Sequence, residues 1–330
     1  MKTDSAEKIL QYIQEKKSAS PSELTEFLDI SAQAVHRQIK KLVEEKKLAK
    51  IGSSPKVRYT LTNQLVEIWV EDDAVTRVRA DHRKTIDERY IYISPLGKLL
   101  VGFAGFVAWC KKTKQPVLKT AEEYISTLRK YDAFKKNGVI DGTEKFQATF
   151  DTMYLDRTYY VDFYSIERFG KTKLGQLLLY AKQSQNKELM RAVVREAKPA
   201  IEHIIQKHHI DALAFVPPSV KRSIQFMTEF ARLLEISLPR VRVTKVTGDI
   251  VVPQKSLSKL SDRIENAANS IFVTEKNVYR NILIIDDAVG SGATLNETAR
   301  KIREQKICKG KIFGLAVTGS FKGFDVISEV

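Results

Sequence analysis

The chain has 330 residues, more than one domain usually contains, and its length predicts two or three units. A hydrophobic content of 43% and a charged content of 29% exclude a disordered or low-complexity protein, and two cysteines exclude a disulfide framework or a four-cysteine metal site. The net charge of +15 favours an anionic partner such as nucleic acid or a phosphorylated ligand.

No targeting segment is expected. The N-terminus lacks the apolar run of a signal peptide, and the longest apolar stretch, residues 99–110, is too short to cross a bilayer. We therefore predict a cytoplasmic protein with no membrane partner.

Residues 1–62 predict three helices followed by a hairpin. Ser20 is a plausible N-cap with Pro21 and Glu23 behind it, which predicts a helix over 21–28. Ser31 opens the next helix, whose core-facing positions are expected to be Val35, Ile39, Leu42 and Val43. Two alternating segments, 48–51 and 57–61, follow around a turn at 52–55. This order of elements is that of a winged helix-turn-helix.

Residues 63–150 carry no motif with recognisable chemistry, and we predict a mostly helical connecting domain. Its apolar run at 99–109 is expected to be a buried core helix, because a helix that is apolar all round is usually interior. The alternative is a helix that forms a homodimer or binds another protein.

From residue 151 to 330 the pattern changes to strands alternating with helices. Such alternation predicts an α/β domain with a parallel sheet and helices on both faces.

The strongest motif runs over residues 282–294. Four apolar residues predict a buried strand that ends at Asp286 and Asp287, and Thr294 opens the next helix after a loop of small residues. Backbone N–H groups of such a loop and the positive end of the helix dipole hold a phosphate without lysines. The two carboxylates are placed to accept hydrogen bonds from a pair of sugar hydroxyls.

This stretch resembles the phosphoribosyl pyrophosphate (PRPP) motif of type I phosphoribosyltransferases. The resemblance implies the fold of that family for residues 151–330. It also implies that Asp286 and Asp287 bind the ribose hydroxyls. The 5′-phosphate would be held by the loop and helix start, Ala288, Val289, Gly290, Ser291, Gly292, Ala293 and Thr294.

Further residues resemble the ComF-like branch of that family. They are Gln254, Leu257, Arg263, Asn266 and Phe272, together with Phe215-Val-Pro-Pro-Ser219 and the following Lys221, Arg222 and Phe226. The resemblance implies a pyrophosphate side made of Ser219, Lys221, Arg222, Lys255 and Arg263, and a flap around 159–175 that recognises the acceptor base. Gly290 stands where enzymes with a base in this loop place an acid, which leaves no general base there.

The candidate DNA contacts lie in the third helix and the hairpin of the winged helix. The N-terminal part of a recognition helix reaches base edges, and basic residues beside it contact phosphates. The predicted contacts are Ser31, Gln33, Ala34, His36, Arg37, Lys40, Lys41, Lys56 and Arg58. A winged helix used only for protein contact is the alternative.

Two functions fit these observations. In the first, the chain is a regulator that binds duplex DNA and senses PRPP or a nucleotide, as in the purine repressors that combine the same two modules. In the second, it is a working phosphoribosyltransferase that uses Mg²⁺ with PRPP, and the winged helix only places it. No protein ligand for the metal is assigned, and the absent loop acid favours the regulator.

Overall fold

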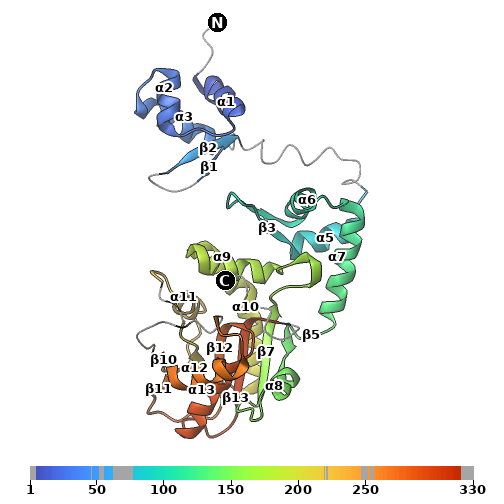
Figure 1. The fold of residues 1–330 in the computed structure, drawn as a ribbon, viewed down its shortest axis with the longest axis vertical. Coiled ribbons are helices and arrows are strands. Elements are labelled where there is room, and N and C mark those ends of the chain that lie inside the picture. Colours follow the sequence, from blue (N-terminus) through green and yellow to red (C-terminus); the bar gives the residue numbers. More distant parts are fainter. Residues whose placement is uncertain are drawn as a thin grey trace. The chain divides into compact units, whose positions relative to one another are not determined.

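A computed structural model describes residues 5–45, 47–51, 56–61, 77–218, 220, 222–246, 252 and 256–320 (Figure 1). The chain divides into two compact units, Met1–Glu123 and Tyr124–Val330. Among the described residues, no helix combines the length and the apolar character that crossing a membrane requires.

The first unit begins with a winged helix, which confirms the predicted order of elements. It contains α1 (Ser5–Lys16), α2 (Pro21–Leu28), α3 (Ala32–Glu44), β1 (Leu48–Ile51) and β2 (Arg58–Leu61). The turn predicted at 52–55 lies outside the described residues. The two strands pair antiparallel, with Leu48 opposite Leu61.

Local chemistry fixes the helix starts in this module. The Ser20 hydroxyl accepts the Glu23 N–H at 3.2 Å and the Glu23 carboxylate accepts the Ser20 N–H at 3.1 Å, which is a capping box. Ile9, Leu24, Val35 and Leu42 belong to one buried cluster. Val43 was expected in this core but is 37% exposed, because it follows Leu42 on the helix and the buried face already ends there.

The rest of the first unit mixes helices with a hairpin. Its elements are α5 (Ala80–Arg89), β3 (Ile91–Ile93), β4 (Leu99–Val101), α6 (Gly102–Lys112) and the start of α7 (Val117–Asp132). The apolar run at 99–109 is therefore only partly a helix. Its first three residues pair with β3, and Leu99 and Val101 are exposed, so the prediction of one buried helix is wrong there.

The second unit is built on a seven-stranded sheet in the order β5-β6-β7-β13-β12-β8-β9. The strands are β5 (Lys135–Lys136), β6 (Val139–Asp141), β7 (Arg157–Phe163), β8 (Ala212–Phe215), β9 (Arg240–Val241), β12 (Ile282–Val289) and β13 (Ile312–Gly319). The five strands from β7 to β9 are parallel, and β5 and β6 add an antiparallel edge. This confirms a mostly parallel α/β sheet. It also starts before residue 151, so the helical character expected of 63–150 does not hold at its end.

Helices and a small second sheet complete this unit. They are α8 (Thr143–Thr149), the 3-10 helix η3 (Glu167–Phe169), α9 (Lys173–Ser184), α10 (Lys187–His208), α11 (Phe226–Leu233), β10 (Val243–Lys245), α12 (Leu260–Ser270), β11 (Ile271–Val273) and α13 (Ala293–Glu304). β10 and β11 pair antiparallel.

The connections place helices on both faces of the sheet. The chain passes from β7 through α9 and α10 to β8 in one direction across the sheet, and from β12 through α13 to β13 in the other. Because such crossovers are right-handed, opposite directions put the helices on opposite faces. α9 and α10 pack on β7, whereas α13 packs on β12 and α12 (Figure 1).

Candidate functional site

The two acids lie within a strand, close to its carboxyl end. The strand was predicted to end at Asp286 and Asp287, but β12 continues two residues further, to Val289. Pairing with β13 extends through Asp286 to Ala288 and Val289, which explains the extra length. Both acids are half-buried, and the Asp286 carboxylate accepts the Asp287 N–H at 2.7 Å.

A lysine from another element compensates the acids. The Lys182 ammonium on α9 lies 2.9 Å from the Asp287 carboxylate. Burial, with the Asp287 charge acting in the same direction, raises the pKa of Asp286 to about 7, although Lys182 and Lys245 oppose the rise. Burial lowers the pKa of Lys245, and Asp286 opposes that shift. A carboxyl group whose pKa is raised this far by burial is typical of a functional site.

Gly292 shapes the loop that follows. Its φ of +86° is strained for any other residue, and a Cβ there would lie 2.3 Å from the Phe146 ring on α8. Gly292 is also the N-cap of α13, which begins at Ala293. The Ser291 hydroxyl accepts the Ala293 N–H at 3.3 Å. The loop therefore brings backbone close to whatever occupies the space in front of α13.

The acids and the loop line one cavity of about 170 Å³. All nine residues from Asp286 to Thr294 take part. The opposite wall comes from the segment after β8 and from α9, α11 and α12, and includes Leu178, Lys182, Val216, Pro217, Pro218, Val220, Arg222, Phe226, Met227 and Arg263.

The sheet topology explains why the cavity is here. β8 and β12 are neighbours, and the chain leaves β8 toward β9 on one side but leaves β12 toward β13 on the other. Open α/β sheets bind ligands beyond the carboxyl ends of the strands at such a switch point. The start of α13 faces this point, and N–H groups of a first helical turn have no partner within the helix.

Two arginines of the predicted pyrophosphate side reach the same cavity. Arg222 donates from Nη1 to the Lys182 carbonyl oxygen, so α9 holds its guanidinium. Arg263 on α12 is buried and donates from Nε to the Leu257 carbonyl oxygen at 2.7 Å, and burial lowers its pKa. Ser219, Lys221 and Lys255 lie outside the described residues.

Only part of the predicted flap borders the cavity. Tyr164, directly after β7, lines it. Tyr159 is buried in the sheet, where its hydroxyl lies 2.9 Å from His208 Nε2 on α10. Alternation in β7 thus sends this aromatic side chain into the helix layer.

Sequence analysis missed Lys182 and Lys245. Lys182 is about a hundred residues from the motif along the chain, and Lys245 lies on the short strand β10. Each is one lysine among many, and no spacing marks it. Their roles come from the crossovers that bring α9 and β10 toward the carboxyl end of β12.

The predicted recognition helix presents a polar face. Gln33, His36 and Arg37 are exposed on α3, whereas Ala34 is half-buried. The Ser31 hydroxyl accepts the Ala34 N–H at 3.3 Å and caps the helix. These exposed side chains can therefore contact a DNA groove without any change in the buried cluster of the module.

The basic residues near this face differ in their partners. Lys40 and Lys41 make only long, exposed ion pairs with Glu44 and Glu45, at 4.0 and 3.9 Å, which contribute little to stability. Lys56 is exposed. The predicted phosphate contact at Arg58 is different, because its guanidinium joins the hairpin to α2.

Arg58 makes four hydrogen bonds within the module. Both Nη atoms donate to the Glu23 carboxylate at 2.8 Å, and Nε and Nη2 donate to the Ser18 hydroxyl and carbonyl at 3.0 and 3.1 Å. Arg58 is thus a structural clamp as well as a surface charge.

Comparison with known proteins supports the N-terminal assignment. Residues 3–47 match a family model described as winged helix-turn-helix DNA-binding. No curated protein sequence shows significant similarity to the chain. One solved structure that resembles it is a hypoxanthine phosphoribosyltransferase from Staphylococcus aureus, with a TM-score of 0.24 and 11% identity, covering 42% of this chain and 80% of that one.

Proposed function

We propose that this chain is a DNA-binding regulator whose C-terminal unit binds PRPP or a related nucleotide. The observation that carries the proposal is the cavity at the β8–β12 switch point, where an acid pair, a small-residue loop, a helix start and two arginines meet. The motif's resemblance to type I phosphoribosyltransferases, and to their ComF-like branch, supports the same conclusion.

The proposed ligand has a diol between two anionic groups. The carboxylates of Asp286 and Asp287 accept the two ribose hydroxyls, and the loop 288–294 holds the 5′-phosphate with backbone N–H groups. Arg222 and Arg263 face the pyrophosphate, and Lys182 adds a third cation beside them. Charge-assisted hydrogen bonds from cations to phosphate are strong, so three cations around this cavity favour a phosphorylated ribose over a neutral sugar.

Magnesium fits this proposal as part of the ligand. Among the described residues, no group of three or more His, Cys, Asp or Glu side chains is placed to hold a metal. Mg²⁺ prefers oxygen ligands and often arrives with substrate phosphates, completed by one or two carboxylates. Asp286 and Asp287 supply carboxylate oxygens, and the pyrophosphate would supply the rest.

The regulator is favoured over a transferase because the loop offers no proton acceptor. Ala288, Val289 and Gly290 stand between the acids and Ser291, and none carries a titratable side chain. A transferase would release pyrophosphate when given PRPP, Mg²⁺ and a set of bases. Pyrophosphate release that depends on Asp286 and Asp287 would move the conclusion to the enzyme.

Calorimetry tests ligand binding directly. The wild-type chain is titrated with PRPP and Mg²⁺ beside the Asp286→Asn/Asp287→Asn variant and an Asp151→Asn control, which changes an exposed acid outside the cavity. Loss of charged hydrogen bonds of about 1.5–3 kcal/mol each should abolish measurable binding in the double variant only. Equal affinity in all three proteins would reject the site.

A further inference from the structure

Most of the excess positive charge lies outside the winged helix. Residues 1–62 contain 12 Lys or Arg and 8 Asp or Glu, which is +4 of the total of +15. Residues 124–330 contain 33 and 23, which is +10. The predicted DNA contacts therefore account for a minor share of the charge.

Part of that charge is concentrated where the central strands of the sheet begin, at the end of the strands opposite the cavity. Three segments meet where β8, β12 and β13 begin: residues 207–211 at the end of α10 and directly after it, 279–281 before β12, and 306–311 between α13 and β13. They carry five exposed cations, here called the basic edge: Lys207, Arg280, Lys306, Lys309 and Lys311.

Hydrogen bonds join these segments into one surface. The Asn281 amide donates to the His208 carbonyl oxygen at 2.9 Å and accepts the Lys311 N–H at 3.0 Å. The Asp211 carboxylate accepts the N–H groups of Arg280 and Asn281, both at 2.9 Å. The three segments of the basic edge are thus joined to one another by hydrogen bonds.

No acid compensates these cations. None of the five makes an ion pair within 4.0 Å among the described residues. Asp211 is the only acid in the three segments, and both of its oxygens accept backbone N–H groups. Nearby, Asp156 pairs with Arg303 at 2.7 Å.

His208 lies close enough to the basic edge for its charges to affect the histidine pKa. Burial lowers the pKa of His208 to about 4, and the charges of Lys207, Arg157 and Lys311 act in the same direction.

Helix dipoles explain only part of the cluster. The C-terminal ends of α10 and α13 favour cations such as Lys207 and Lys306. Arg280, Lys309 and Lys311 precede strands, which have small net dipoles. No helix dipole therefore stabilises these three cations. Like charges gathered without partners repel one another, and an anion would relieve this cost.

We propose that the basic edge binds the phosphate backbone of duplex DNA as a second, sequence-independent contact. The five long side chains are exposed and none of them lines the cavity, which suits contact with a polyanionic backbone, whereas a free nucleotide needs a concave site. Single-stranded nucleic acid favours exposed aromatic rings, and the only aromatic residue besides histidine in the three segments is the half-buried Tyr279. The winged helix in the same chain makes duplex DNA the natural partner.

Salt dependence of DNA binding tests the proposal in the full chain. Lys306→Ala/Lys309→Ala/Lys311→Ala should make the slope of log affinity against log salt shallower by about 2.7, because each phosphate contact contributes roughly 0.9. Affinity at ~0.1 M salt should fall on the order of 100-fold. Fluorescence anisotropy with a labelled duplex gives both values.

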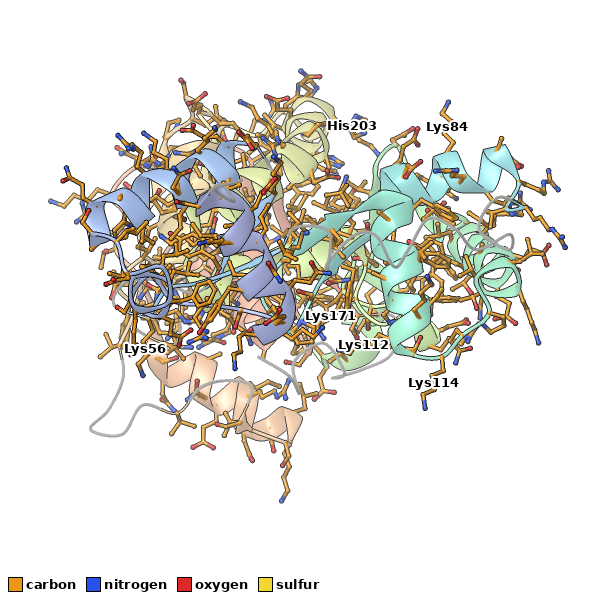
Figure 2. All side chains as sticks on the ribbon, turned by 90° about the horizontal axis from the view of Figure 1, so that it is seen from above. Lys56, Lys84, Lys112, Lys114, Lys171 and His203 are labelled. Atoms are coloured by element: carbon orange, nitrogen blue, oxygen red, sulfur yellow. The ribbon has the colours of Figure 1, made fainter. Side chains whose placement is uncertain are left out.

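The control removes the same charge elsewhere. Lys84, Lys114 and Lys136 are exposed and make no ion pair within the described residues, and Figure 2 shows the first two extending away from the ribbon. Their triple alanine variant should bind DNA like the wild type. A triple Lys→Arg variant of the basic edge should retain the wild-type slope.

Two results would overturn the proposal. They are an unchanged slope in the basic-edge variant, or an equal loss of DNA affinity in the control triple. These readouts contain no PRPP, so they fail or succeed independently of the ligand proposed for the cavity.

Discussion

Asp286→Asn should stabilise the chain at high pH while destroying ligand binding. In the wild type, burial and the neighbouring Asp287 raise the pKa of Asp286 from an ordinary 3.8 to about 7. A raised pKa in the folded state means that folding favours the protonated acid. Its contribution to stability is complete below the unfolded pKa and is lost as pH rises through about 7.

The magnitude follows from the same values. Each unit of pKa corresponds to about 1.4 kcal/mol, so ionising Asp286 in the folded chain costs on the order of 4 kcal/mol at alkaline pH. Asparagine keeps an oxygen that can accept the Asp287 N–H and carries no charge. The variant should therefore exceed wild-type stability at pH 8.5, and the difference should shrink toward pH 5.

Denaturant unfolding across this pH range is the assay, with Asp287→Asn as the matched control. That variant leaves the half-buried Lys182 without its anion, so it should be less stable than Asp286→Asn at alkaline pH. An Asp286→Asn variant whose stability relative to wild type does not change with pH would refute the reasoning.

Further expectations concern backbone strain and the winged helix. Gly292→Ala should lower stability by about 1–3 kcal/mol and weaken PRPP binding. Gly138→Ala is the control, because Gly138 has a φ of +80° but an added Cβ would meet nothing within 4 Å. It should lower stability only through backbone strain of about 1 kcal/mol, and thermal melting measures both variants. Arg58→Ala should destabilise the winged helix in thermal melting, while Lys56→Ala should leave stability unchanged and make the DNA salt slope shallower by about 0.9. Ser20→Ala should cost about 1 kcal/mol through loss of the capping box, measured by denaturant unfolding.

The winged helix was predictable because its boundaries depend on local chemistry. Ser20 and Ser31 cap helices through bonds to residues three positions away, and the sequence contains both partners. The strand containing Asp286 was also predictable from its apolar run. Its extension to Val289 was not, because it depends on pairing with β13.

The features that sequence analysis missed or predicted wrongly all depend on contacts between parts of the chain that are distant in sequence. Residues 99–101 look like the start of an apolar helix, but pairing with β3 makes them a strand. β5 and β6 are too short to show a pattern and become strands only beside β7. Lys182 enters the cavity through the packing of α9, which no local spacing reveals.

The central claim is that ligand binding at the cavity regulates DNA binding. A regulator requires the ligand to change DNA affinity, and reciprocity then requires DNA to change ligand affinity by the same factor, typically 5- to 150-fold. The decisive measurement is the DNA dissociation constant of the full chain by fluorescence anisotropy, with and without saturating PRPP and Mg²⁺ at fixed ionic strength. The account predicts a change of at least about fivefold that disappears in Asp286→Asn/Asp287→Asn. An unchanged dissociation constant, in a protein that calorimetry shows to bind PRPP, would contradict it.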